Sequence, residues 1–538
     1  MGDRRIIAID CETDPFLYGR VPEPFIWGSY DGKEFKTFAT GGELLDFWKT
    51  KNVYLFAHNG GKFDFMFLLE HIEESRIRLI NSRIVEMRIG KALLRDSFSI
   101  IPTALAAFQK DKFEYWKLEK QHRGKYKDEI IKYLRSDCVN LFNLVTHYFK
   151  IAGNKCTIAA NALAHARKLG IDPGKTTHRF DDVFRNFYFG GRVEAFKPGI
   201  HKNIHIFDIK SAYPYAMVHN HPSGSNYIVD DTLKWYSEEN IAQSFIDITC
   251  FSRKAFPLRT KLGLSFPEAL GRYKITGWEY LCAKKHGLIS HEKINTVYFL
   301  ENEITFTDYV NHWFKSKDTA EKEGNKAGRL IAKIMLNSLY GKLAQNPVNY
   351  FDYKIMEACS EIDFANGWEL QGVVHDKEIH ARPVLWKYQN KYGDDWIKFP
   401  IHYNVATAAS ITGYTRAHLM DAIHTVGPQN VLYCDTDCIF TFKNAPVFDL
   451  DQSGKLGSWG WEGLADPVYI AGKKLYGLTF INGPKKGETK LAHKGAKLTL
   501  ENIRTLCEGG TVEWVSDAPS FSLCQSAKFV KRRITKTA

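Results

Sequence analysis

The chain has 538 residues, 44% of them hydrophobic and 25% charged, and 73 basic against 61 acidic side chains give a formal net charge of +12. This excess favours a polyanionic partner, although a ribosomal or membrane-surface protein would show the same excess. No apolar run reaches the roughly 18 residues of a transmembrane helix, and the ten cysteines form no Cys-x-x-Cys pair, which argues against zinc modules and for reduced thiols in a cytosol.

Acidic residues follow apolar, strand-like runs near the N-terminus. The run 5–9 leads to Asp10 and Glu12, which share one face of an extended chain because residues i and i+2 point the same way. Asp64 follows a second apolar run, and Asp137 lies in a helical stretch. Four carboxylates on separate elements can form a two-metal centre at which water attacks. Taken singly, each of these carboxylates has another interpretation, as an acidic residue at a strand edge or on the surface of a helix.

A second set of carboxylates lies further along the chain. The apolar run 203–207 delivers Asp208 to a turn closed by Pro214, and a later β-rich run ends at Asp435 and Asp437. Two like charges this close destabilise a fold unless a cation neutralises them, and oxygen ligands indicate Mg²⁺ or Mn²⁺. An Asp-Thr-Asp turn exposed to solvent is the alternative for the last pair alone.

Between these carboxylates a helical pattern presents Lys333, Asn337 and Tyr340 on one face, at i, i+4 and i+7. Going back along the chain, steps of four, three and four continue this face through Lys322, Lys326 and Arg329. A basic ridge that ends in an amide and a phenol suits a triphosphate followed by a base pair. A solvated cationic helix face is the alternative.

In order and spacing, three segments resemble motifs A, B and C of family B DNA polymerases, in the protein-primed branch of phages and linear plasmids. They are Asp208-Ile-Lys-Ser-Ala-Tyr213-Pro214, Lys333-Ile-Met-Leu-Asn337-Ser-Leu-Tyr340-Gly341 and Tyr433-Cys-Asp435-Thr-Asp437. The resemblance implies that Asp208 and Asp437 bind the catalytic metals and that Asp435 supports the site.

The same resemblance implies nucleotide contacts. Lys333 would contact the incoming triphosphate, together with the ridge residues Lys322 and Arg329. Asn337 and Tyr340 would line the nascent base pair. Tyr213 would stack under the sugar and exclude a 2′-hydroxyl.

The N-terminal carboxylates resemble the Exo I, Exo II and Exo III motifs of the 3′–5′ proofreading domain in this family. The resemblance implies that Asp10, Glu12, Asp64 and Asp137 bind metal and that Tyr133 orients the attacking water. The positions that would hold a single-stranded 3′ end are Thr13, His58, Asn59, Phe63 and Phe67, where aromatic stacking tolerates any base. Lys117 resembles a lysine that assists this step, although Lys120 or Lys125 could serve equally.

Shorter motifs add candidate DNA contacts. The segment Tyr188-Phe-Gly190-Gly191 resembles the family's Tyr-x-Gly-Gly motif, whose glycines let backbone N–H groups approach a phosphate. An ordinary Gly-Gly turn is the alternative. Lys474-Leu-Tyr476 resembles a Lys-x-Tyr motif that grips primer phosphates, and Lys494 and Lys497 are further candidates for backbone contact.

These motifs predict a multidomain α+β / α/β protein with an RNase H-like exonuclease domain and a right-hand palm–fingers–thumb polymerase domain. We expect the exonuclease in residues 1–182, palm and fingers in 183–489 and the thumb in 490–538. The insertions of the protein-primed branch are expected at 215–313 and 347–399, on either side of fingers at 314–346.

The expected activity is template-directed DNA synthesis with 3′–5′ proofreading, with two Mg²⁺ or Mn²⁺ ions in each active site. The expected partners are primer-template DNA, single-stranded DNA, deoxynucleoside triphosphates and a terminal protein that primes synthesis. We expect a monomer in the cytoplasm, of the host cell if the protein is viral, with no membrane partner. Two alternatives remain: an exonuclease with an inactive polymerase half, and a single-strand-binding replication accessory.

Overall fold

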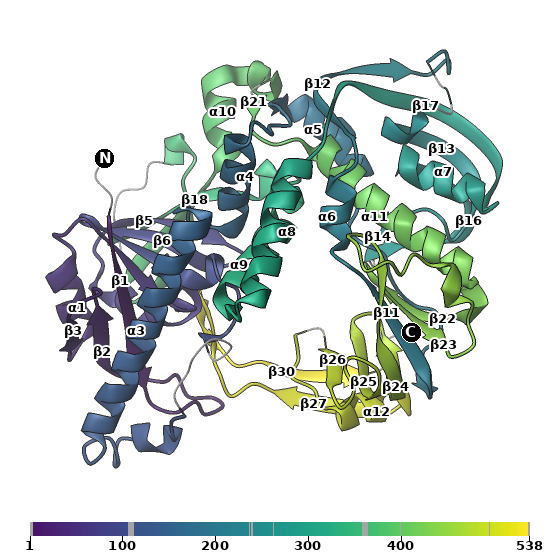
Figure 1. Cartoon of the computed structure of the whole chain (residues 1–538). Coiled ribbons are helices and arrows are strands. Elements are labelled where there is room, and N and C mark those ends of the chain that lie inside the picture. Colours follow the sequence, from purple (N-terminus) through teal and green to yellow (C-terminus); the bar gives the residue numbers. More distant parts are fainter. Residues whose placement is uncertain are drawn as a thin grey trace.

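The computed structural model describes residues 4–105, 112–235, 237, 240–261, 263–357, 364–398, 400–493, 495–523 and 525–535. The largest sheets in these ranges have ten, eight and four strands. Figure 1 shows the N-terminal sheet on the left, the four-stranded sheet at the upper right and the eight-stranded sheet at the lower right. None of the described helices is both long and apolar enough to span a membrane.

The ten-stranded sheet is built on central strands that are buried on both faces. In spatial order its strands are β19 (Glu369–Val374), β20 (Lys377–Pro383), β18 (Phe351–Glu357), β5 (Ser75–Ile80), β6 (Arg83–Ile89), β7 (Ala92–Asp96), β4 (Val53–Ala57), β1 (Arg5–Thr13), β2 (Pro24–Tyr30) and β3 (Phe35–Phe38). β1, β4 and β7 are parallel. The helices of this unit are α1 (Gly41–Trp48), α2 (Asp64–Leu68) and α3 (Lys127–Ala152).

Three strands of this sheet come from far along the chain. β18 pairs antiparallel with β5, and β19 and β20 extend the sheet beyond it. The segment expected as the second insertion, 347–399, therefore joins the N-terminal unit. Its remaining elements include helix α10 (Val384–Tyr392), and just after it β21 (Pro400–Ile401) pairs with β8 (Thr176–Thr177).

The eight-stranded sheet holds the second set of acidic segments. Its strands are β26 (Thr489–His493), β25 (Leu475–Asn482), β24 (Trp459–Gly472), β11 (Ile204–Ile209), β23 (Cys438–Phe442), β22 (Val431–Asp435) and β9 (Val193–Ala195), with β10 (Gly199–His201) paired to β24. Helix α6 (Ala212–Met217) follows β11, and the largely buried α11 (Val405–Val426) precedes β22. β26, which overlaps the start of the expected thumb, pairs with β25 in this sheet.

The segment 215–313 forms a sheet of its own, consisting of β12 (His221–Asp230), β17 (Ile289–Ile304), β13 (Ser244–Arg253) and β16 (Glu268–Thr276), with helix α7 (Gly277–Lys285) and the hairpin β14 (Leu258–Thr260) and β15 (Gly263–Ser265). Helices α8 (Thr307–Lys322) and α9 (Lys326–Leu343) follow as a hairpin. One apolar core joins α3, α8, α9 and α4 (Ile158–Lys168), so the N-terminal unit and this hairpin are packed together.

The C-terminal region returns to the N-terminal unit. It contains α12 (Leu500–Cys507), the pair β27 (Thr511–Val515) and β30 (Lys531–Thr535), and the hairpin β28 (Ser520–Ser522) and β29 (Gln525–Lys528). In Figure 1 the yellow strands cross the lower part of the molecule toward the purple N-terminal sheet. Phe521 and Leu523 of the hairpin are buried in the core of that unit.

Candidate active sites

Asp208 and Asp437 come together where neighbouring strands of the eight-stranded sheet end. Asp208, near the end of β11, pairs with Cys438, the first residue of β23. The backbone N–H of Ile209 donates to the carbonyl oxygen of Asp437 at 2.6 Å. Asp435 and Cys438 pair across a two-residue turn that contains Asp437. Segments more than 200 residues apart in sequence thus place two carboxylates at one sheet edge.

The carboxylates repel each other in a partly buried site. Burial, Asp437 and Glu462 raise the pKa of Asp208 to about 7. Burial and Asp435 raise the pKa of Asp437 to about 6. A divalent cation would relieve this repulsion, and an all-oxygen donor set fits Mg²⁺ or Mn²⁺.

A cavity of about 380 Å³ opens in front of these carboxylates. The sequence-predicted residues that line it are Asp208, Asp437, Tyr213, Lys333, Asn337 and Arg329. The carboxylates lie on the sheet side of the cavity, and the basic residues and the amide come from α9. A cavity with carboxylates on one wall and cationic side chains on the other suits a metal-bound triphosphate.

The prediction of one continuous helical ridge is wrong. Lys322 is the last residue of α8, and α9 begins at Lys326 after a turn in which Gly324 has φ +66°. Lys322 is exposed, whereas Lys317 of α8 lines the cavity beside Arg329. Lys317 was missed because an antiparallel helix hairpin, unlike a single helix, brings residues together that no helical period connects.

Tyr340 reaches the site through Tyr213. Their rings stack with centroids 4.0 Å apart and an angle of 17° between the ring planes. Burial raises the pKa of Tyr213 to about 12 and that of Tyr340 further, so both phenols stay neutral. Tyr213 lines the cavity with Asp208, and Tyr340 packs against its ring; their sugar and base contacts stay predictions.

Asp435 is held by protein groups. Lys474 forms an ion pair with it at 2.5 Å, and the hydroxyl of Tyr433 donates to its other oxygen at 3.4 Å. The N–H of Lys474 donates to the same hydroxyl at 3.1 Å. Tyr476 is buried against Tyr433, with ring centroids 5.0 Å apart. The Lys-x-Tyr segment thus supports the turn of Asp435 and Asp437 directly.

Glu462 of β24 is a third carboxylate of the cavity that the sequence analysis missed. It forms ion pairs with Lys485 and with Lys490, the latter at 3.0 Å. Burial opposes its ionisation, but the two lysines lower its pKa below the ordinary value. It stands alone in the sequence Trp-Glu-Gly, so no local pattern marks it.

The segment Tyr188–Gly191 lies directly against the acidic turn. A Cβ on Gly191 would lie 2.4 Å from Oγ1 of Thr436, between the two carboxylates. The guanidinium of Arg416 donates to the carbonyl oxygens of Phe189 at 2.6 Å and Gly190 at 3.1 Å. The loop is therefore held in contact with the carboxylate turn.

The N-terminal carboxylates also converge. Asp10 and Glu12 lie on β1, Asp64 begins α2, and Asp137 lies in α3, one turn after Tyr133. Besides burial, which is the largest cause, all four acidic groups raise the pKa of the Cys138 thiol, so all four lie within electrostatic range of it. Burial raises the pKa of Asp64 to about 7. Such a donor set fits divalent cations.

Tyr133 and Lys117, which were predicted to assist the reaction at this site, have different surroundings. The ring of Tyr133 stacks on Phe113 with centroids 4.5 Å apart, and burial, Tyr115, Asp137 and Glu12 all raise the pKa of its hydroxyl. Lys117 forms ion pairs with Glu129 at 2.7 Å and Glu114 at 3.1 Å. Its role in the exonuclease step stays a prediction.

Comparison with known proteins places this geometry in a family. The family model described as "DNA polymerase type B, organellar and viral" matches residues 107–427. The chain is 34% identical to the DNA-directed DNA polymerase of Enterobacteria phage PRD1, over 99% of this chain and 98% of that protein. The chain belongs to the family B DNA polymerases. It is a DNA-directed DNA polymerase, and the predicted family is confirmed.

The polymerase also shares its fold with a solved relative. The crystal structure of phi29 DNA polymerase covers 99% of this chain and 100% of its own, with a TM-score of 0.76 at 17% identity. In sequence the polymerase of Bacillus phage phi29 is 22% identical over 88% of this chain and 86% of its own. This likeness confirms the predicted multidomain α+β / α/β architecture of exonuclease, palm, fingers and thumb.

The residues predicted to hold a 3′ end lie beside the N-terminal carboxylates of the polymerase. Phe63 and Phe67 are in ring contact at 5.1 Å, and both contact Phe521 of the C-terminal hairpin. Nδ1 of His58 lies 2.9 Å from the Ser97 hydroxyl. The two remaining candidates of this group are Thr13, which is buried, and Asn59, which accepts from Arg83 at 2.8 Å.

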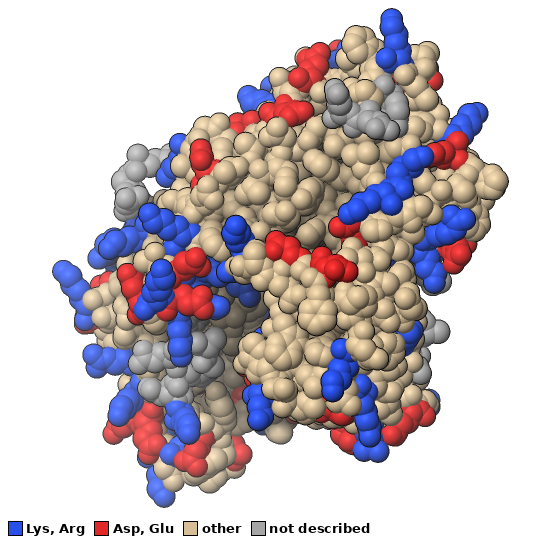
Figure 2. Space-filling view, turned by 45° about the vertical axis from the view of Figure 1, so that its right-hand side comes forward, with Lys and Arg blue, Asp and Glu red and all other residues tan. Residues whose placement is uncertain are grey.

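On one face of the polymerase the positive charge is spread out. Figure 2 shows Lys and Arg side chains scattered over the edges of this face, with broad uncharged areas between them. Of the two C-terminal lysines predicted to touch DNA, Lys497 is exposed, and Lys494 lies outside the described residues. On this face, the distribution of charged side chains does not by itself indicate where DNA binds.

Proposed function

We propose that this polymerase adds deoxynucleotides to a primer 3′-hydroxyl at the Asp208–Asp437 site and removes mispaired ends at the Asp10–Glu12–Asp64–Asp137 site. The observation that carries the proposal is the cavity that unites Asp208 and Asp437 with Lys333 and Asn337. The solved complexes of phi29 DNA polymerase with primer-template DNA and incoming nucleotides support these partners for the same fold.

Two divalent cations at the Asp208–Asp437 site would activate the attacking hydroxyl and stabilise the leaving phosphate. The chain positions the substrates. Lys333 places a point charge on the triphosphate. Tyr213 lies under the sugar, and Tyr340, stacked against Tyr213, lines the base pair. Lys474 neutralises Asp435, which keeps that carboxylate in its supporting position.

At the exonuclease site the four carboxylates would hold the ions that activate water. Tyr133 would keep its proton and donate a hydrogen bond, because burial and acidic neighbours raise its pKa. The rings of Phe63 and Phe67 would stack on the frayed end, a role that single-stranded DNA bound to phi29 DNA polymerase supports for this fold.

We further propose that a terminal protein primes synthesis, so that its hydroxyl replaces the primer 3′-hydroxyl. The support is the resemblance of motifs A to C to the protein-primed branch, together with separate segments at both expected insertions: the four-stranded sheet after motif A and strands β18 to β20. Phage relatives favour the host-cell cytoplasm as its location.

Extension of a primed template with and without Mg²⁺ tests the central proposal. Asp437→Asn should abolish extension and spare degradation of single strands, and Asp64→Asn should do the reverse. Both variants should melt at the wild-type temperature within a few degrees. Well-folded variants that keep both activities would contradict the assignment.

Terminal-protein priming needs its own test. The polymerase is incubated with labelled nucleotides and a candidate terminal protein. A protein–nucleotide adduct is expected, and it should disappear in Asp437→Asn. Absence of any adduct with all four nucleotides, under conditions in which DNA primers are extended, would contradict protein priming alone.

A further inference from the structure

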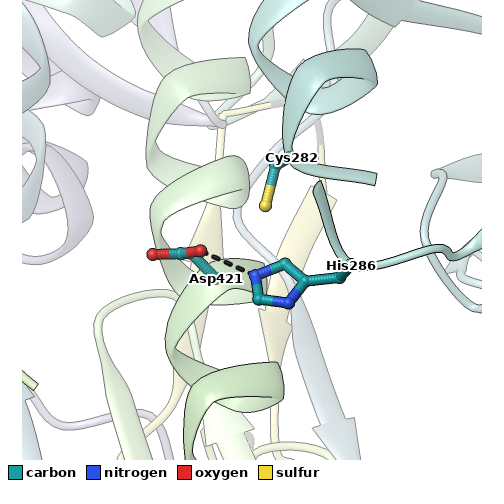
Figure 3. Close-up of side chains that lie close together, drawn as sticks. All are labelled: Cys282, His286 and Asp421. Carbon is teal, nitrogen blue, oxygen red and sulfur yellow. Dashed lines mark hydrogen bonds and ion pairs between the residues drawn. The ribbon is translucent and has the colours of Figure 1, made fainter. Parts of the chain in front are cut away.

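Three side chains of different metal-binding character meet between α7 and α11, and none of them belongs to either carboxylate site. They are Cys282, His286 and Asp421, and their sulfur, nitrogen and oxygen donor atoms all lie within 4.8 Å of one another. Figure 3 shows the thiol and the imidazole projecting from α7 and its C-terminal end toward the carboxylate on α11.

The secondary structure fixes this grouping. Cys282 and His286 are four residues apart, and the N–H of His286 donates to the carbonyl of Cys282 at 3.2 Å, so they share one face of the helix end. Nε2 of His286 lies 2.7 Å from Oδ1 of Asp421. The Cys282 thiol donates to the carbonyl oxygen of Ala417, one turn earlier in α11, at 3.3 Å.

The surroundings suit a divalent ion. Cys282 is 9% exposed, whereas the Asp421 side chain is 37% exposed, so the thiol end is closed and the carboxylate end opens to solvent. Lys285 also pairs with Asp421 at 2.6 Å, with its side chain 63% exposed. A divalent ion bound by thiolate, carboxylate and neutral imidazole would form a neutral site and release Lys285 to water. The ring of His424, 5.4 Å from that of His286, closes another side.

The donor types select the metal. Thiolate and imidazole are preferred by Zn²⁺ and Co²⁺, whereas Mg²⁺ and Ca²⁺ take oxygen ligands. Zn²⁺ bonds of about 2.0–2.3 Å place ligand atoms roughly 3–4 Å apart. Nε2 of His286 and Oδ1 of Asp421, 2.7 Å apart, therefore need to separate slightly to admit the ion. Every other pair of donor atoms lies within 4.8 Å, so side-chain rotation can bring the thiol into range.

We propose that Cys282, His286 and Asp421 bind one Zn²⁺ ion, with water as the fourth ligand. α7 belongs to the segment of the four-stranded sheet, and α11 leads into β22, which ends at Asp435. The ion therefore ties the inserted sheet to the helix that precedes the catalytic turn. Its role is structural and separate from nucleotide transfer.

Titration of the full-length chain with Co²⁺ in excess Mg²⁺ tests the site, because Mg²⁺ occupies carboxylate sites without taking thiolate. A thiolate-to-Co²⁺ absorption band that saturates at one equivalent is expected. Cys282→Ser should abolish the band, and so should His286→Gln, which keeps a polar side chain beside Asp421. Cys507→Ser is the matched control and should retain it, since Cys507 lies in α12.

Thermal unfolding gives a second measurement. Zn²⁺ should raise the melting temperature of the wild type and of Cys507→Ser, and leave that of Cys282→Ser and His286→Gln unchanged. Absence of the Co²⁺ band in the wild type would overturn the proposal. A band that survives Cys282→Ser, or equal stabilisation of all variants by Zn²⁺, would overturn it as well.

Discussion

The acidic turn leaves no room beside Gly191. A Cβ on Gly191 would lie close to Oγ1 of Thr436 and 2.6 Å from Cγ2 of the same residue. Thr436 has φ +59°, and its N–H donates to the carbonyl oxygen of Arg192 at 2.7 Å. At the neighbouring Gly190, by contrast, no atom of the described residues lies within 4 Å of the position that a Cβ would take. The two adjacent glycines therefore differ sharply in the space that they leave for a side chain.

Gly191→Ala should slow nucleotide addition by at least about tenfold, because the methyl group displaces Thr436 and with it the carboxylates on either side. Degradation of single-stranded DNA should stay near the wild-type rate, since the N-terminal carboxylates are elsewhere. Single-turnover extension measures the effect. Gly124→Ala is the matched control, because the described residues leave its Cβ position open and it belongs to no predicted site, and it should extend primers normally. Equal rates for both variants would contradict the contact.

The raised pKa of Asp208 predicts how stability depends on pH. Its pKa is about 7 in the folded chain against an ordinary value of 3.8. Without metal the native state thus binds this proton more tightly than the unfolded state does. The free energy of unfolding should therefore fall as pH rises from about 4 through about 7.

Asp208→Asn removes this titration. The metal-free variant should melt a few degrees above the wild type near pH 8, and the difference should vanish near pH 4. Mg²⁺ should raise the melting temperature of the wild type more at the higher pH, and less in the variant. Differential scanning fluorimetry across pH measures both. A difference that is constant with pH would contradict the assigned cause.

At the scale of elements, a buried ion pair connects α7 and α11, and through Arg416 it reaches the Tyr188–Gly191 loop. Glu279 of α7 and Arg416 of α11 form a two-point contact at 2.7 and 3.0 Å, and their side chains are 1% and 2% exposed. Arg416 also holds the carbonyl groups of Phe189 and Gly190. Helix α7 therefore supports the loop that packs on the acidic turn.

Glu279→Gln should lower the free energy of unfolding by about 3 kcal/mol, because it leaves a buried guanidinium without its counter-charge. Urea unfolding measures the change. Glu292→Gln removes the partner of Lys284 in an ion pair whose side chains are 33% and 49% exposed, and should cost less than about 1 kcal/mol. Similar losses in both variants would contradict the importance of burial.

The elements that carry the site were predictable where the pattern is local. β1, β11 and β22 are apolar runs that end in acidic residues, and the motif residues of α9 keep helical spacing. The break before α9 was also readable, because Gly324 suits a left-handed turn and the side chain of Asn325 caps the helix by accepting from Gly328.

Long-range partners were not predictable from one sequence. The strand pattern of β18 does not specify β5 as its neighbour, because backbone pairing is the same for any partner of suitable register. Glu462 gives no local signal for the same reason: its place in the cavity depends on the order of strands in the sheet. Site residues that lie in the middle of separate strands, one on each strand, can be grouped only when the order of the strands is known.

At the scale of the whole molecule, the C-terminal hairpin packs against the N-terminal unit. Phe521, 8% exposed, packs against Phe67 and Phe63 with ring centroids 5.5 and 5.9 Å apart. Leu523 is 1% exposed, and Nζ of Lys62 donates to the carbonyl oxygen of Phe521 at 3.5 Å. The hairpin is thus anchored by an aromatic cluster that also includes the predicted 3′-end site.

Phe521→Ala should weaken this contact and let DNA leave sooner, since truncating a buried Phe costs about 3–5 kcal/mol of packing. Products made during a single binding event should become several-fold shorter, while single-nucleotide addition stays near the wild-type rate. Primer extension with a DNA trap measures both. Phe448→Ala makes the same change at a side chain that is 89% exposed, and should leave product length unchanged. If both variants make products of wild-type length, the hairpin does not retain DNA, and the contact serves only to pack the two units together.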